Sequence, residues 1–203
     1  MIIATLRSLR WADYFLFTVI DPRALYRQIK SNDPRAMALS FTVPVIVAIT
    51  ELLTGSLMGR PTSFFFYKIS YGWILHSMVL VFLIIITAAL MDLIIQFMGM
   101  KGNVRELIIV INYAIFPKVF LLPLVYIFKV VNFAPGFFYV LFSLGLFIWS
   151  AFITIQALSE MHATDFGKAL LIFLFPILLM GIFIFFGSVL FFFSGMGLIS
   201  SMI

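Results

Sequence analysis

Three ionisable side chains, Glu51, Asp92 and Lys118, stand well inside long stretches of apolar residues in this chain. Charged side chains within a membrane span are costly, so they usually face the interior of a helix bundle or a wet cavity and mark a functional pathway. Two other polar residues, His76 and Asn112, lie in the same stretches. These five residues form the candidate intramembrane polar site, which would line either an ion or proton pathway or a polar pocket.

Helical rise indicates which of these side chains can meet. At about 1.5 Å per residue, Asp92 and Lys118 lie roughly 9 and 17 Å from the inner ends of their stretches, and Glu51 lies about 24 Å along its own. A lysine side chain spans about 6 Å, so Lys118 can pair with either carboxylate, and more easily with Asp92 if it points inward. His76 lies at the depth of Glu51; a hydrogen bond between them is an alternative to the lone interfacial histidine that we expect.

A purely structural explanation competes with the functional one. Lys118 and one carboxylate would form a pair between helices, while the other polar groups reach an interface along their apolar stems. Pro117 precedes the lysine and Pro123 follows it in the same stretch. Because proline removes a backbone donor, we expect these residues to kink the helix and free backbone carbonyls around Lys118.

The apolar stretches themselves determine the class of protein. Crossing about 30 Å of hydrocarbon takes about 20 mainly apolar residues, and five stretches reach that length: Ala36–Leu57, Ile69–Phe97, Leu107–Phe128, Phe137–Leu158 and Ala169–Phe193. The chain is 64% hydrophobic and only 10% charged, more apolar than a soluble fold of this size can bury. We therefore predict an all-α, polytopic membrane protein with an amphipathic leader, residues 1–35, and one membrane domain, residues 36–203.

The residues that would support enzymatic or metal chemistry are missing. The chain contains no cysteine, which removes disulfides, thiolate catalysis and thiolate-bound metals, and its two histidines argue against a histidine metal site. No metalloprotease, hydrolase or phosphate-loop motif occurs. Glu160, His162 and Asp165 cluster between the last two spans, but Thr164 or Asp165 as the cap of the final helix explains them. We predict a protein that is not an enzyme and binds no cofactor.

The distribution of Lys and Arg predicts the orientation. Short cytoplasmic loops retain basic residues, and nine of the thirteen fall in the N-terminal segment and the second and fourth loops, against three in the remaining loops. We therefore expect a cytoplasmic N-terminus and an external C-terminus. This topology also explains the net charge of +5 without a nucleic-acid partner. The tail 194–203 is expected to be an interfacial turn or a re-entrant segment.

The leader carries signals for a short helix on the membrane surface. Asp21-Pro22 and Asp33-Pro34 each place a capping carboxylate before a proline, predicting helices that begin at Pro22 and at the first span. The first helix, Pro22–Ser31, is amphipathic, and such a helix lies on an anionic inner leaflet, unless neighbouring segments hold it in solvent. The basic residues expected at that surface are Arg23, Arg27, Lys30 and Arg35.

Several motifs occur in an order that resembles one known family. The leader Asp21-Pro22…Tyr26…Ile29 is followed by a second-loop pattern of which Gly99, Gly102, Arg105 and Glu106 are the main residues. Tyr113 and Pro117 come next, and then Trp149 and the run Ala157-Leu158-Ser159-Glu160-Met161-His162-Ala163-Thr164. The order resembles the Yip-one domain family, the Ypt-interacting proteins, although Ala157 stands where a glycine is expected. The resemblance implies five spans with a cytoplasmic N-terminus.

What the resemblance implies about function is limited by the leader. In eukaryotes the family is implied in vesicle traffic through prenylated Rab-type GTPases, a role that relies on a long polar N-terminal region. The leader here is short and mostly amphipathic, which is similar to the compact prokaryotic branch, so Rab binding is not carried over. We expect a multi-pass protein of a prokaryotic cytoplasmic membrane.

Three functions fit these observations. The first is a non-enzymatic accessory or scaffold subunit of a larger complex, such as one for ABC-type export, trafficking or envelope assembly, whose partners would be the anionic inner leaflet and other membrane proteins or further copies of the chain. The second is a small transporter or channel component that uses Lys118 with Asp92 or Glu51. The third is a lipid-interacting protein that shapes the membrane, suggested by the aromatic content of 18%.

Overall fold

The computed structural model describes residues 10–30, 34–59 and 70–200, and the remaining residues lie outside the described part. Across these segments the chain is built from helices joined by short turns, without a strand. Five helical segments are long and apolar enough to cross a membrane: Ala36–Leu57, Gly72–Phe97, Val104–Val130, Pro135–His162 and Phe166–Phe192. The prediction of an all-α, polytopic membrane protein is confirmed, and the spans agree with those read from the sequence to within a few residues at most ends.

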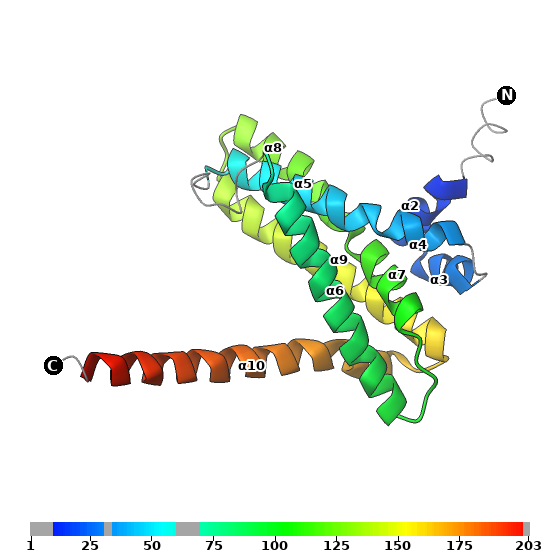
Figure 1. Cartoon of the computed structure of the whole chain (residues 1–203). Helices are drawn as coiled ribbons and strands as arrows, with labels where there is room; N and C mark the ends of the chain where they lie inside the picture. The colour runs from blue at the N-terminus through cyan, green and yellow to red at the C-terminus, as the bar shows by residue number, and fades with distance from the viewer. Residues whose placement is uncertain (1–9, 31–33, 60–69, 201–203) are drawn as a thin grey trace.

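The first two spans form an antiparallel pair. The first consists of α4 (Pro34–Ser40) and α5 (Thr42–Leu57), which a turn at Phe41 separates. The second is one helix, α6 (Gly72–Phe97), whose N-terminal half packs against α5 and whose C-terminal half runs away from it (Figure 1). Its expected first residue, Ile69, lies outside the described part of the chain.

The third span is broken in its middle, as Pro117 predicted. An α-helix, α7 (Val104–Ala114), passes into a 3₁₀ segment, η2 (Phe116–Phe120), and the α-conformation resumes in α8 (Leu121–Val130). Proline at the second position of η2 has no N–H to donate to the preceding turn. The chain closes the tighter turn instead, with the backbone N–H of Lys118 donating to the Ile115 carbonyl at 3.0 Å.

The last two spans are long helices that separate from each other. The fourth is α9 (Pro135–His162) and the fifth is α10 (Phe166–Ser200), whose first turn is capped by Asp165: its Oδ2 accepts from the Lys168 N–H at 3.3 Å. Only the start of α10 packs against α6 and α9, and the rest leaves the bundle (Figure 1). The helix continues through residues 194–200, so both expectations for the tail, an interfacial turn and a re-entrant segment, are wrong for these residues.

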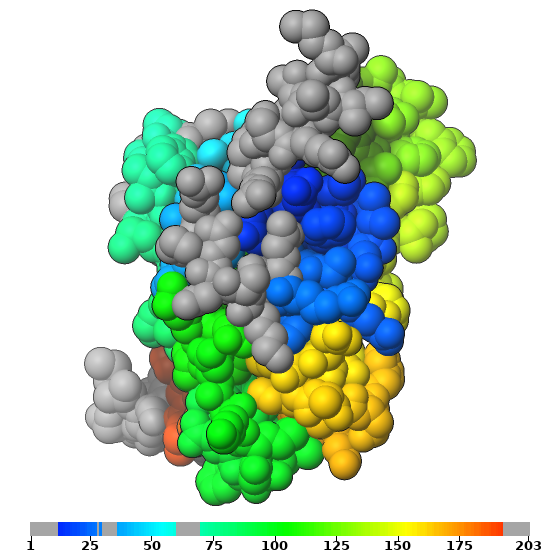
Figure 2. Space-filling view, turned by 90° about the vertical axis from the view of Figure 1, so that its right-hand side faces the viewer, coloured from blue at the N-terminus to red at the C-terminus, as the bar shows by residue number. Residues whose placement is uncertain are grey.

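The leader folds onto the bundle and does not lie apart from it. It forms α2 (Arg10–Ile20) and α3 (Pro22–Lys30), and Asp21 between them caps α3 as predicted, because its Oδ1 accepts from the N–H groups of Arg23 and Ala24 at 3.1 Å each. In Figure 2 these helices, in blue, lie directly against the end of α9, in yellow, and they also pack against α7. Asp33, the other predicted cap, lies outside the described residues.

The apolar stripe of α3 is buried in protein. Leu25, Tyr26 and Ile29 are almost fully buried in a core shared with Ile109 and Ala157. The stripe that was expected to enter the inner leaflet is therefore covered by α7 and α9. The basic face points away, with Arg23 and Arg27 exposed, while the side chains of Lys30 and Arg35 lie outside the described part.

Candidate functional site

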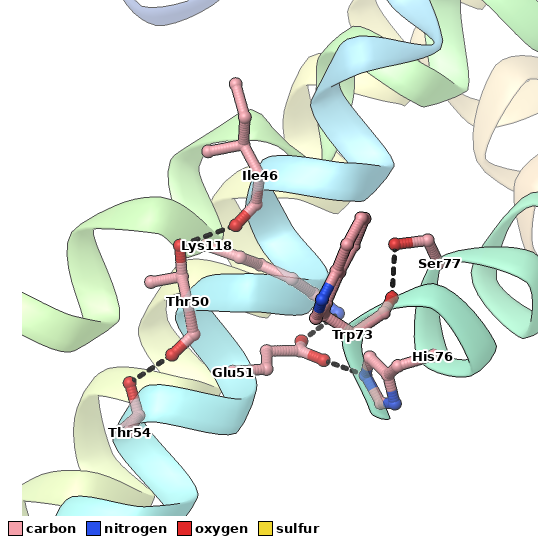
Figure 3. A network of polar contacts seen from close by, with 8 residues as sticks. All are labelled: Ile46, Thr50, Glu51, Thr54, Trp73, His76, Ser77 and Lys118. Atoms are coloured by element: carbon pink, nitrogen blue, oxygen red, sulfur yellow. Dashed lines mark hydrogen bonds and ion pairs between the residues drawn. The ribbon is translucent and has the colours of Figure 1, made fainter. Parts of the chain in front are cut away.

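Glu51, His76 and Lys118 come together inside the bundle, from three different elements. Glu51 lies on α5, His76 on the second turn of α6 and Lys118 on the 3₁₀ segment η2 (Figure 3). Nε2 of His76 lies 2.7 Å from Oε2 of Glu51, and Nζ of Lys118 donates to the other carboxylate oxygen at 3.4 Å. The Glu51 carboxylate thus contacts His76 through one oxygen and Lys118 through the other.

This arrangement changes two expectations drawn from the sequence. Lys118 pairs with Glu51, although Asp92 was expected to be easier to reach, and His76 is bonded to Glu51 and is not a lone interfacial histidine. The 3₁₀ segment rises about 2.0 Å per residue, more than the roughly 1.5 Å of an α-helix, so the depth of Lys118 counted at the α-helical rise was only approximate. The choice between the two carboxylates also depends on the rotation of the helices, which depth along the span does not determine.

The three side chains are partly buried. Their side-chain exposures are 32% for His76, 27% for Glu51 and 30% for Lys118. Partly buried charges need partners, because an unpaired charge in a poorly solvated place is strongly destabilising. The shared carboxylate supplies those partners, and the remaining exposure keeps the groups accessible to a ligand.

A cavity of about 270 Å³ adjoins this network. Its polar lining consists of the three residues above with Tyr139 and Ser143 from α9, and Ser143 Oγ is buried with no hydrogen-bond partner among the described residues. The rest of the wall is apolar, formed by Leu52, Leu121, Leu146 and Phe147. The cavity can therefore hold a small polar group with an apolar extension.

The hydroxyl groups near the network belong to their own helices. Thr50 donates to the Ile46 carbonyl at 2.6 Å and Thr54 to the Thr50 carbonyl at 2.7 Å, as Figure 3 shows. Ser77 does the same on α6, toward Trp73. Bonds of this kind satisfy a hydroxyl within an apolar span, so these residues need no ligand to explain them.

Asp92 and Asn112, the other two candidates, lie apart from this cavity. Asp92 is buried, accepting from Gln96 Nε2 at 2.6 Å through one oxygen, while its Oδ1 has no hydrogen-bond partner among the described residues. Asn112 donates to Ser40 Oγ at 3.1 Å. The five candidates therefore separate into one cluster of three residues and two isolated polar groups.

The second-loop residues have structural roles at the opposite end of the bundle. Gly99 adopts a positive φ of 76° at the end of α6, and a Cβ at Gly102 would overlap the Asp92 carboxylate. Glu106 accepts from Tyr26 in the leader at 3.3 Å and from Asn103 at 2.8 Å, whereas Arg105 is exposed. The loop thus joins α6, α7 and the leader.

Tyr26 shows the effect of this docking most directly. Burial of its phenol, together with the charge and the hydrogen bond of Glu106, raises the pKa of Tyr26 from its usual 10.0 to about 12. A phenolate beside a carboxylate is unfavourable, so the neutral form is held. Among the described residues, Glu160, His162 and Asp165 included, no group of three or more His, Asp or Glu side chains is placed to hold a metal ion.

The sequence reading missed the contribution of α9 to the cavity. The residues of α9 that line it are Tyr139, Ser143, Leu146 and Phe147, and the first three follow one another at intervals of four and three residues. Such spacing places side chains on one face of a helix. Tyr139 and Ser143, two polar residues one turn apart in an otherwise apolar span, are the sequence signal that could have identified this face.

Comparison with known families gives one match. The family model of the Yip1 domain matches residues 17–188, from within α2 to the exposed part of α10, and confirms the resemblance carried by the motifs. Neither a curated protein nor a solved structure matches the chain. The match covers the leader from residue 17 onward, the broken third span and all three residues of the Glu51 cluster.

Proposed function

We propose that this chain, which belongs to the Yip1 domain family, is a non-enzymatic accessory or scaffold subunit of a larger membrane complex. It is a multi-pass membrane protein with five apolar helices long enough to span a bilayer. The observation that carries the proposal is the uncovered length of α10. No other span of the described chain leaves the bundle in this way (Figure 1).

The second half of α10 exposes apolar side chains all around. Phe183 is 69% and Phe191 83% exposed, and only 17% of the most apolar window of this span is buried, against 50% for the third span. Association of helices in a bilayer is driven by side-chain packing and interhelical hydrogen bonds. A long helix without packing partners therefore offers a surface to the spans of another protein.

The distribution of exposed basic residues supports a topology with the N-terminus in the cytoplasm. Arg23, Arg27, Lys101, Arg105 and Lys168 are exposed on α3, the second loop and the start of α10, at the end of the bundle where the leader docks. Lys129 is exposed at the other end, in the last turn of α8. We infer a cytoplasmic N-terminus in a prokaryotic inner membrane, with the basic end on the anionic leaflet.

Crosslinked affinity purification from native membranes, quantified by mass spectrometry, tests the accessory role. We expect a partner at near-stoichiometric yield, and we expect the F183A/F191A variant to lose most of it. Phe137 on α9 is exposed to a similar degree, 65%, so F137A is the matched control and should retain the partner. Recovery of the chain alone, or only with further copies of itself, contradicts the proposal.

A small transporter or channel component is the second candidate, favoured by the cavity beside Glu51 and Lys118. Charged groups lining a wet cavity within a span are typical of ion and proton pathways. Purified protein in liposomes with an internal pH-sensitive dye tests this function. Proton flux above that of empty liposomes, lost in a folded K118M variant, supports it; a wild-type rate equal to that of empty liposomes excludes proton conduction.

A further inference from the structure

We propose that the cavity beside Lys118 binds the phosphate group of a phospholipid, whose acyl chains lie outside along α9. This goes beyond the accessory role, because it assigns a ligand to a site that the role does not use. It also does not depend on that role, since capture of a partner and binding of a lipid are measured separately. The proposal rests on three features of the cavity: its unused donors, the uneven contacts of Glu51, and the position of Phe147.

The cavity contains hydrogen-bond donors that have no partner among the described residues. An ammonium group has three N–H donors, and among the described residues Lys118 directs a hydrogen bond to Glu51 alone. Ser143 adds a buried hydroxyl with no partner among the described residues. A phosphate oxygen accepts from both kinds of donor, and such charge-assisted bonds are the strong ones.

The two contacts of Glu51 show that Lys118 can turn toward a ligand. The His76 contact is short, 2.7 Å, whereas the Lys118 contact is long, 3.4 Å, for a charged hydrogen bond. Because a carboxylate only accepts, His76 must donate through Nε2. That bond keeps Glu51 in place when the lysine moves, so an anion can take the ammonium without leaving the carboxylate unpartnered.

The position of Phe147 gives the ligand its second chemical property. This residue lines the cavity and is 49% exposed on the outer side of α9. It continues a stripe of exposed apolar residues, Val140, Leu144 and Ile148, at the spacing of one helix face. The cavity therefore reaches the surface that faces lipid, and a ligand with a phosphate and an apolar tail fits both parts.

The size of the cavity limits what enters it. At about 270 Å³ it lies below the usual range for binding a whole drug-sized molecule, about 300–1,000 Å³. The headgroup phosphate can enter while the acyl chains remain on the stripe beside Phe147. We therefore assign the ligand to phospholipids and not to soluble phosphate esters.

Native mass spectrometry of the detergent-solubilised full chain tests this assignment. The probes are a phosphatidylglycerol and the diacylglycerol with the same acyl chains, which lacks the phosphate. We expect the phospholipid to bind at least tenfold more tightly than the diacylglycerol, and K118M to abolish most of that difference. K129M removes a lysine outside the cavity and should bind as wild type does.

The S143A variant keeps the test independent of any effect of K118M on folding. The loss of one hydroxyl donor should weaken phosphatidylglycerol binding by about three- to tenfold. Equal binding by wild type, K118M and S143A overturns the proposal, as does equal binding of the diacylglycerol. If glycerol phosphate displaces the phospholipid at comparable concentration, the site recognises phosphate without its lipid, and the lipid assignment is wrong.

Discussion

The ammonium of Lys118 lies 3.4 Å from the carboxylate of Glu51, across a separation of 67 residues in the sequence. The 3₁₀ segment around Pro117 makes this pairing, because it places Lys118 on a short, tightly wound turn between two α-helices. His76 completes the network from a third helix at 2.7 Å. A proline in the third span thus lies next to the lysine that joins this network and lines the cavity.

Removing one partner of this pair should destabilise the fold more than removing both. E51L leaves Lys118 partly buried without its carboxylate, whereas E51L/K118M replaces the pair by apolar groups that pack without charge. Because the groups are about one third exposed, solvent screening limits the coupling between them to about 1 kcal/mol. Thermal unfolding in detergent of the two single variants and the double variant measures it; strictly additive effects would show that the pair contributes no coupling.

A side chain at Gly102 should destabilise the fold. A Cβ at this position overlaps the carboxylate of Asp92, which is buried in α6, so G102A forces either the loop or the aspartate to move. Overpacking of this kind costs about 1–3 kcal/mol, and we expect a matching fall in thermal stability. Gly136, where an added Cβ meets no atom within 4 Å, is the control, and G136A should unfold within a degree or two of wild type.

The sequence predicted the spans well, because their length and hydropathy follow from bilayer thickness and do not depend on how the helices pack. It predicted the cap at Asp21 and the break at Pro117 for a similar reason, since both are local effects of one or two residues. The partner of Lys118 was not predicted, because depth along a span leaves the rotation of each helix open. The packing of α3 against α7 and α9 was not predicted either, because an apolar stripe can face either protein or lipid.

The docking of the leader should weaken at high pH, as Tyr26 loses its proton. Its pKa is about 12 in the folded chain, above the usual 10.0, so the folded state holds the proton more tightly than the unfolded state. This contribution is fully present below pH 10 and is lost as the pH rises through 12. Y26F removes both the hydrogen bond to Glu106, worth about 0.5–1.5 kcal/mol, and this dependence.

Thermal unfolding of wild type and Y26F at pH 8 and pH 11.5 checks this expectation. The difference in unfolding temperature between the two proteins should shrink at the higher pH. Wild type loses the stabilisation from protonated Tyr26, which the variant lacks at both pH values, while other ionisations affect both proteins alike. Tyr126 is 56% exposed, and Y126F controls for the loss of a hydroxyl elsewhere. A difference that stays constant with pH would show that the Tyr26 proton is not held by the fold.

The cap of α3 determines whether the leader stays on the bundle. Asp21 Oδ1 accepts from two backbone N–H groups at 3.1 Å, and replacing such a cap by alanine costs about 0.5–2 kcal/mol. Because α3 is a short helix, D21A should loosen it and uncover the core around Leu25 and Ile29. Hydrogen exchange of residues 22–30 should then be faster, while residues 107–113 of α7 change less. D21N, which keeps the capping oxygen, should exchange as wild type does; equally fast exchange in D21N and D21A would assign the effect to the charge of Asp21 and not to its cap.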